Sequence, residues 1–260
     1  MILGGLIKTY WAKKEKIDPK KIVVVSVMPC VAKKYEIQKK ELKINGQKPV
    51  DFVLTTRELA YLFAKRKIDL KNVQPQEVDN PLGDASGAGV IYGASGGVAE
   101  SVLRTAYQKM TQKKLSQIDF KEVRGQEGVK KALININGKI IKMAIVNGLG
   151  NAKKILEELK ENPTAYDGLE VMACPGGCVG GGGQPVPADA AIRNKRAESL
   201  YEIDEKKENR LAHENPIVQR IYREFLNSPK IIQQICHTKY FKKKREVHSI
   251  LKSNTKLWIK

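Results

Sequence analysis

The sequence predicts an α/β protein with two lobes, each a small twisted, largely parallel β-sheet flanked by helices, and a helical C-terminus. Two short apolar strand patterns, residues 22–28 and 169–172, are each followed closely by a cysteine. Amphipathic helical patterns alternate with the strand patterns. We expect the first lobe over residues 1–80, the second over 81–186, and a helical region with a basic tail over 187–260.

Composition limits the possible functions of the chain. With 260 residues and 42% hydrophobic content it can bury a real core, and no apolar run approaches the roughly 20 residues that span a bilayer. The N-terminus does not resemble a secretory signal, so we expect a cytoplasmic protein with no membrane partner. The net charge of +19 is spread over the chain without a nucleic-acid-binding motif. We therefore expect no nucleic acid partner, and a lysine-rich solvated surface that also suits an acidic protein.

In the first lobe, apolar residues at helical spacing predict an amphipathic helix to about residue 16. Its abrupt start suggests a further segment upstream. The β-branched run at 22–28 predicts a strand buried on both faces, which places Cys30 just beyond its carboxyl end. A second strand is expected at 50–54, and Thr55 with Glu58 forms a capping box for the next helix. The polar stretch that follows marks the boundary between the lobes.

In the second lobe, the glycine-rich segment 83–97 precedes a helical stripe. It lacks a P-loop ending, so we favour close backbone packing over phosphate binding. Residues 133–136 and 140–146 flank Asn137-Gly138 and predict a hairpin. A helix follows over about 152–159, and the strand at 169–172 then delivers Cys174 at its carboxyl end.

The C-terminal region begins after Pro185. Asn215-Pro216 has the form of a helix start. His213 and His237 have no metal-ligand spacing, and Cys236 lies in an apolar run that indicates a structural role. The charge run at 242–245 indicates a solvated tail.

The stretch at 170–185 (EVMACPGGCVGGGGQP) is central, because it carries Cys174 and Cys178 among glycines. Thiolates are soft ligands for zinc or iron–sulfur clusters, and glycines let the backbone approach a bulky inorganic group. A buried pair of inert cysteines is the alternative. With Cys30 at the end of the other strand, a cleft between two lobes could hold one cluster.

Residues 28–36 (MPCVAKKYE) and 170–185 resemble the second and third signature motifs of the iron-only (FeFe) hydrogenases. The resemblance extends from residue 2 to about 240 through shorter motifs. These are, with their positions, LTTRELA (54–60), GASGG (93–97), EVRG (122–125), NGLGNA (147–152) and HENP (213–216).

The resemblance implies an H-cluster, a 4Fe-4S cube joined to a di-iron unit with carbon monoxide, cyanide and dithiolate ligands. Cys30 and Cys174 would ligate the cube, and Cys178 would both ligate it and bridge to the di-iron unit. Lys33 would donate to a cyanide ligand. The side chains expected to support these roles are Met28 and Met172 as soft walls, Glu36 orienting Lys33, and Gly177 and Gly181 in the cofactor-binding loop.

The implied reaction is reversible reduction of protons to hydrogen. The implied partners are ferredoxin or an upstream iron–sulfur domain, and the hydrogenase maturation proteins. The family's first motif, Thr-Ser-Cys-Cys-Pro-x-Trp, is absent from the sequence. We therefore expect a C-terminal part of the catalytic domain that is inactive without the missing N-terminal segment or subunit.

Two other functions remain open. An iron–sulfur assembly or sensory homologue could keep the cysteines without the di-iron chemistry, although Lys33, Met28 and Met172 argue against it. The other is a zinc or cluster-binding module. Structural zinc sites usually have four protein ligands, however, and three cysteines leave one position open.

Overall fold

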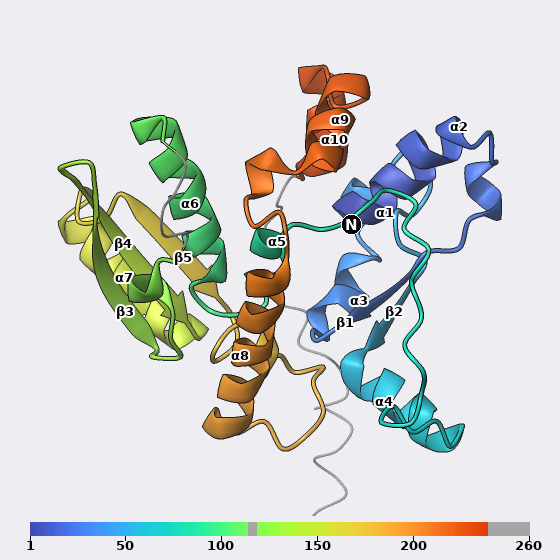
Figure 1. The fold of residues 1–260 in the computed structure, drawn as a ribbon, viewed down its shortest axis with the longest axis horizontal. Helices are drawn as coiled ribbons and strands as arrows, with labels where there is room; N and C mark the ends of the chain where they lie inside the picture. Colours follow the sequence, from blue (N-terminus) through green and yellow to red (C-terminus); the bar gives the residue numbers. More distant parts are fainter. Residues whose placement is uncertain (114–118, 239–260) are drawn as a thin grey trace, which may run out of the picture.

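The computed structural model describes residues 1–113 and 119–238, so the predicted basic tail lies outside the described residues. A two-stranded sheet and a three-stranded sheet lie on opposite sides of α8 (Ala190–Lys206) (Figure 1). This arrangement confirms the α/β class with two lobes and a helical C-terminus. The boundaries at residues 80 and 186 stay predictions.

The first lobe opens with consecutive helical segments. They are α1 (Ile2–Leu6), a π-helical segment η1 (Ile7–Trp11) and α2 (Ala12–Lys14). The predicted helix is confirmed. The π-helical segment was not predicted, because hydrophobic periodicity does not report which carbonyl each N–H contacts.

The first sheet pairs β1 (Val25–Met28) with β2 (Phe52–Thr55) in parallel, and α3 (Ala32–Glu36) follows β1. The helix α4 (Thr56–Lys65) begins directly after β2. Its predicted capping box is confirmed, since the Glu58 N–H donates to Thr55 Oγ1 and the Thr55 N–H donates to Glu58 Oε2.

The prediction that the first strand is buried on both faces is wrong. Val25, Val27 and Phe52 point to one face of the sheet and are 50%, 44% and 61% exposed. The opposite face, which carries Met28 and Val53, is covered. A β-branched run indicates a strand that can be buried on both sides, but burial needs a second layer. None of the described residues provides that layer.

The second sheet has the order β3-β4-β5, with β3 (Val129–Ile136) antiparallel to β4 (Lys139–Asn147) and β4 parallel to β5 (Gly168–Met172). The predicted hairpin is confirmed. Its two turn residues, Asn137 and Gly138, have φ of 52° and 84°, the left-handed values that this tight turn requires.

Two helices cover the faces of the second sheet. The first, α6 (Gly97–Thr111), packs Leu103 against the face carrying Ile134 and Ile145. The second, α7 (Leu149–Glu161), packs Ile155 against Val146 on the other face. Because residues 143–147 of β4 are covered on both sides, the second lobe has the buried strand that the first lobe lacks.

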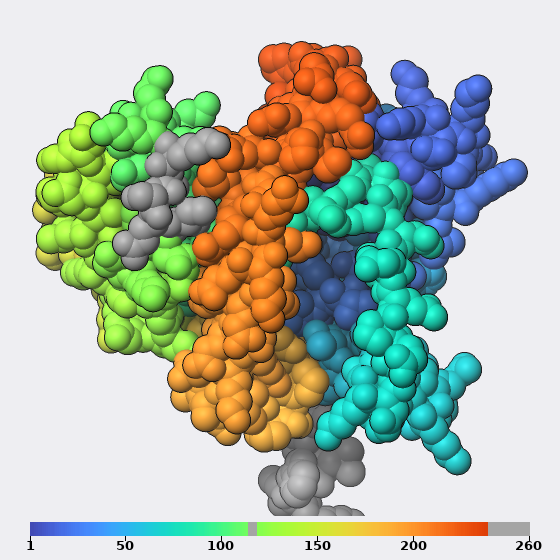
Figure 2. All heavy atoms as spheres, in the orientation of Figure 1, coloured from blue at the N-terminus to red at the C-terminus, as the bar shows by residue number. Residues whose placement is uncertain are grey.

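The C-terminal helices connect the lobes (Figure 2). The helix α8 packs on α5 (Gly87–Ile91) of the second lobe. The helices α9 (Pro216–Glu224) and α10 (Pro229–Cys236) share an apolar core with the opening helix of the first lobe. The predicted start of α9 is confirmed, since Asn215 accepts hydrogen bonds from the N–H groups of residues 217 and 218.

The remaining helical turns are short. They are η2 (Pro19–Lys21), η3 (Lys40–Leu42), η4 (Lys121–Val123), η5 (Cys178–Gly180) and η6 (Ala212–Glu214). Within residues 1–113 and 119–238, no helix has the length and apolar character needed to cross a membrane.

Candidate iron–sulfur site

Three half-buried cysteines lie at the junction of the lobes. Cys30 follows Pro29 at the carboxyl end of β1, and Cys174 lies two residues beyond the end of β5. Cys178 begins η5. Each lobe therefore delivers thiol groups from the carboxyl end of a strand, where open α/β sheets place their ligands.

Close backbone contact joins the lobes at this point. The Gly183 N–H donates to the Pro29 carbonyl at 3.0 Å. A Cβ added to Gly181 would lie 2.1 Å from the same oxygen, and one on Gly183 would lie 2.8 Å from the Cys30 nitrogen. Only glycine permits this approach. The identity of Gly181 is thus explained by its contact with the first lobe, and its role toward a cofactor stays a prediction.

The loop between Cys174 and Cys178 packs on the glycine-rich segment at 93–97. The Ser95 N–H donates to the Gly176 carbonyl, and the Val179 N–H donates to the Gly93 carbonyl, both at 3.0 Å. Gly177 has φ of 90°, and a Cβ there would lie 2.7 Å from the Ser95 nitrogen. This confirms the close backbone packing predicted for the segment.

The three thiols influence one another electrostatically. Burial raises the pKa of Cys178, and negative charge on Cys30 and Cys174 raises it further, while the Lys33 ammonium lowers it. The raised pKa of Cys178 means that a bound cluster, which takes cysteine as the thiolate, would stabilise the charged form of this group.

The donor set fits a cluster better than a single ion. No three His, Cys, Asp or Glu side chains within the described ranges are close enough to hold one metal ion. A cube of iron and sulfide binds each thiolate at a different iron, so its ligands can be farther apart. The three cysteines fit the cube ligands that the family resemblance implies.

Several other predicted site residues line one small recess. They are Met28, Lys33 and Glu36. Lys33 Nζ lies 2.8 Å from Glu36 Oε2, which is the contact that an orienting role for Glu36 requires. Met172 ends β5 and does not line this recess. Cys236 packs against the apolar core of α9 and α10, apart from the three clustered thiols, as its predicted structural role requires.

Two buried polar residues whose roles the sequence did not indicate support the cysteine loop, Asn147 by direct contact and Glu170 through the glycine-rich segment that packs on the loop. Asn147, 3% exposed at the end of β4, accepts from the Gly176 N–H at 3.1 Å and donates to the Glu127 carbonyl at 2.6 Å. Glu170 in β5 accepts from the N–H groups of Gly96 and Ala99 at the start of α6. In each case the sequence signal that could have indicated a structural role was a polar residue within an otherwise apolar strand.

We expect Glu170→Gln to destabilise the second lobe. The carboxylate receives one N–H at each oxygen, whereas an amide can offer an acceptor to only one of them. Leaving a buried N–H without an acceptor costs about 1–3 kcal/mol. Urea unfolding measures the loss, and Glu161→Gln, at the exposed end of α7, should change it little. Equal stabilities of the two variants would contradict this role.

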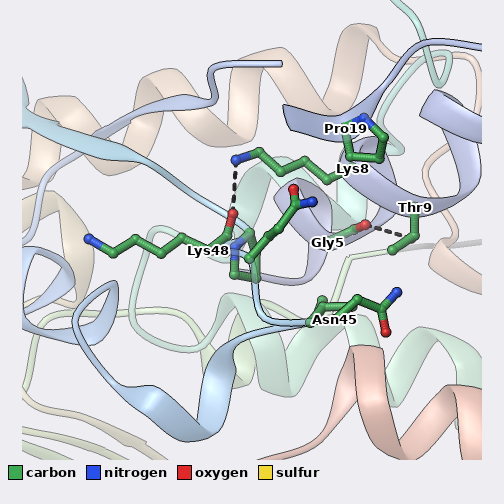
Figure 3. A pocket seen from close by; sticks show the side chains of 9 residues that line it. Gly5, Lys8, Thr9, Pro19, Asn45 and Lys48 are labelled. Atoms are coloured by element: carbon green, nitrogen blue, oxygen red, sulfur yellow. Dashed lines mark hydrogen bonds between the residues drawn. The ribbon is translucent and has the colours of Figure 1, made fainter. Parts of the chain in front are cut away.

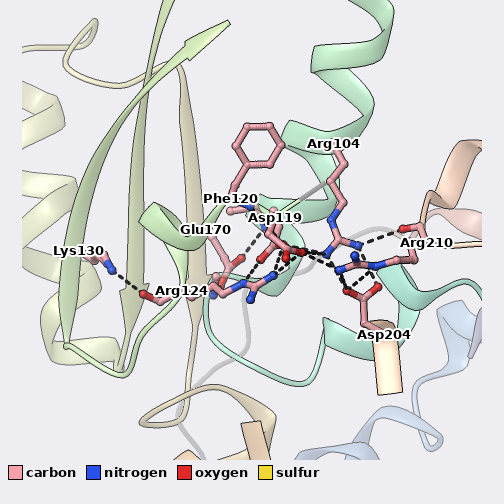
Figure 4. A network of polar contacts seen from close by, with 11 residues as sticks. Arg104, Asp119, Phe120, Arg124, Lys130, Glu170, Asp204 and Arg210 are labelled. Atoms are coloured by element: carbon pink, nitrogen blue, oxygen red, sulfur yellow. Dashed lines mark hydrogen bonds and ion pairs between the residues drawn. The ribbon is translucent and has the colours of Figure 1, made fainter. Parts of the chain in front are cut away.

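A buried ion network fixes α6 against α8 (Figure 4). The Arg104 guanidinium is fully buried and donates to Glu100 at 2.8 Å and to Asp204 at 2.8 and 3.0 Å. The outer members of the network are Arg124, Arg210 and Asp119. Among the described residues, the ion pairs of these six side chains are with one another, and none of them is with a cysteine.

A separate small pocket lies beside the opening helix (Figure 3). Lys8 crosses it to the Lys48 carbonyl at 2.9 Å and pairs with Asp51 at 2.6 Å. These contacts tie residues 44–51 to the helix. The pocket contains no cysteine, so we assign it a structural role.

The fold and the three converging thiols define an α/β protein with a candidate iron–sulfur site. Residues 1–182 match the family model described as iron only hydrogenase large subunit, C-terminal domain, and residues 190–243 match the model described as iron hydrogenase small subunit. The chain belongs to the iron-only hydrogenase large-subunit family.

Individual relatives agree with this assignment. The chain is 44% identical to the NADP-reducing hydrogenase subunit HndD of Solidesulfovibrio fructosivorans, over 94% of this chain and 42% of that protein. It is 39% identical to iron hydrogenase 1 of Clostridium pasteurianum, over 93% of this chain and 43% of that protein. This chain therefore spans less than half the length of these relatives.

A solved structure has the same fold. The FeFe-hydrogenase HydA1 of Chlamydomonas reinhardtii superposes with a TM-score of 0.75 at 37% identity, covering 92% of this chain and 68% of that one. A different kind of relative, the cytosolic Fe-S cluster assembly factor narfl of Danio rerio, is 26% identical over 92% of this chain and 60% of that protein.

Proposed function

We propose that this chain forms part of an H-cluster site for the reversible reduction of protons to hydrogen. The observation that carries the proposal is the convergence of Cys30, Cys174 and Cys178 from two lobes, beside the Lys33 ammonium. When bound, the cluster supplies the redox chemistry that interconverts protons, electrons and hydrogen. Ferredoxin or an attached iron–sulfur domain is the proposed electron source, and the +19 charge suits an acidic donor.

The residues of the chain have distinct proposed roles. Cys30, Cys174 and Cys178 would hold the cube, and Cys178 would also be the thiolate nearest the di-iron unit. Lys33, held by Glu36 at 2.8 Å, donates to an anionic ligand of that unit. Met28 shares the recess with this ion pair and supplies an apolar wall, and Met172 is proposed to supply another from β5. These side chains position the cluster and exclude water.

We further propose that another polypeptide segment completes the site. Three cysteines leave one cube position without a protein ligand, and the hydrogenase relatives are more than twice as long as the matched part. The bare sheet face at Val25, Val27 and Phe52 offers an apolar surface on which such a segment can pack. It would carry the family's first cysteine motif.

Iron–sulfur assembly is the second candidate function, supported by the likeness to assembly factors at 26–31% identity. The hydrogenases named above are more similar, at 37–44%. The pairing of Lys33 with Glu36 beside Met28 also favours the hydrogenase proposal, because a cube alone has no anionic di-iron ligand for this ammonium to bind.

The experiment that tests the proposed function co-expresses the chain with an upstream segment carrying the Thr-Ser-Cys-Cys-Pro motif and the maturation proteins, under anaerobic conditions. Infrared spectra should show carbonyl and cyanide bands, and the sample should evolve hydrogen from a reduced ferredoxin. The matched control is Cys178→Ser, which should lack the bands. A cube signal without carbonyl or cyanide bands in the complete sample would support the assembly function instead.

A further inference from the structure

The glycine run after Cys178 is held by an arginine on each side. From α4 in the first lobe, Arg57 donates through Nε to the Gln184 carbonyl at 3.0 Å. Its Nη2 donates to the carbonyls of Gln184 at 2.7 Å and Gly182 at 3.3 Å. From α8, Arg196 donates to the carbonyls of Val179 and Pro185 at 3.1 and 3.0 Å.

The main chain adds to the contact from the first lobe. The Arg57 N–H donates to the Gly183 carbonyl at 2.9 Å, while the Gly183 N–H donates to the Pro29 carbonyl. The run is thereby held between Pro29 and Arg57, which both belong to the first lobe. Arg57 is fixed relative to Cys30, because α4 continues directly from β2, and β2 pairs with the strand that ends before Cys30.

Chemistry explains why an arginine holds this segment. A run of glycines has no side chains that could interlock with the opposite lobe, so only its carbonyl and N–H groups are available for attachment. The guanidinium offers five donors in a planar fork, which can reach the carbonyls of Gly182 and Gln184 together. A lysine ammonium has the same charge but lacks this fork.

We propose that Arg57 is a positioning residue that sets the separation of Cys30 and Cys178 across the junction of the lobes. Because these cysteines are the proposed cluster ligands, this role of Arg57 rests on the proposed function. Arg196 holds the run within the second lobe, because α8 packs there, so the two arginines have separable effects. Loss of the Arg57 side chain removes its hydrogen bonds to the Gly182 and Gln184 carbonyls and leaves only the main-chain contacts at Gly183 to tie the run to the first lobe. Loss of the Arg196 side chain leaves all the contacts with Pro29 and Arg57 in place.

The test uses the cofactor-free full chain in a Cys236→Ser background, with dibromobimane as a bifunctional thiol reagent. Mass spectrometry of the digested protein gives the yield of the Cys30–Cys178 product relative to the Cys174–Cys178 product. Arg57→Ala should lower this ratio severalfold, and Arg57→Lys should lower it less. Arg66→Ala, at the C-cap of α4, should leave the ratio unchanged.

Thermal unfolding of each variant separates positioning from general stability. A lowered ratio in a variant that melts like the parent protein supports the proposal, and an unchanged ratio in such a variant overturns it. If Arg57→Ala does not fold, the same two outcomes are read from Arg57→Lys. Because no iron is used, a failed hydrogenase assay would leave this result unaffected.

Discussion

The variant Arg104→Met is expected to lose about 3 kcal/mol of unfolding free energy, the lower end of the cost of breaking a buried ion pair. Methionine fills similar volume but leaves the Glu100 and Asp204 carboxylates with fewer donors in a fully buried position. The loss stays at the lower end because Arg124 and Arg210 still contact these carboxylates. Urea unfolding followed by circular dichroism measures it.

The control for this variant is Lys109→Met, which removes a cation from the exposed end of the same helix and should change stability by less than about 0.5 kcal/mol. The pH dependence gives a second check. Burial raises the pKa of Asp204, but hydrogen bonds from Arg104 and Arg210 outweigh it and lower the pKa below 3.8. A lowered folded-state pKa gives stability above pH 3.8 that is lost as the pH falls through the folded-state value.

The difference in unfolding free energy between the native protein and Arg104→Met should therefore become smaller as the pH falls below about 3.8. In acid, protonation of Asp204 removes its ion pair with Arg104 from the native protein. A constant difference between pH 7 and pH 3 would show that the network contributes through packing and not through charge.

The variant Cys178→Ser is expected to bind iron at least about tenfold more weakly during anaerobic reconstitution. Removing a residue that only hydrogen-bonds to a metal ligand already lowers metal affinity about 10–100-fold, and Cys178 is proposed to be a ligand itself. Serine is close in size, but its hydroxyl is a poor ligand for iron–sulfur clusters compared with a thiolate. Iron and sulfide analysis with electron paramagnetic resonance of the reduced protein measures the change. Folding is checked by the thermal melt.

Cys236→Ser provides the matched control, because this thiol packs in the core of the C-terminal helices and should leave the iron content unchanged. Equal iron loss in both variants would mean that oxidation or misfolding, and not ligand loss, decides the result. Undiminished iron in Cys178→Ser would remove Cys178 from the ligand set.

Local patterns in the sequence were sufficient to predict several elements. The Thr55 and Glu58 capping box, the Asn137-Gly138 turn and the Asn215 cap are all observed. Each depends on contacts within a few residues, so the signal and the structure lie in the same short window. The positions of Cys30 and Cys174 after strands followed from the same kind of pattern.

The supporting contacts of the site could not be predicted in this way. Glu100 and Arg104 have the spacing of an ordinary surface ion pair on a helix, and only the packing of α8, 100 residues later, buries them with Asp204. Arg57 resembles a solvated helix residue until the glycine run, about 125 residues away, is placed against it.

The locally encoded features of this protein, namely most of its helices and strands, the three thiols and the family resemblance, could be predicted from motifs and caps in the sequence. The exposed face of the first sheet and the side chains that hold the cysteine loops became known only from the folded protein. The physical reason is that burial and long-range hydrogen bonds depend on what other segments bring to a surface, and a residue's neighbours in sequence do not specify those segments.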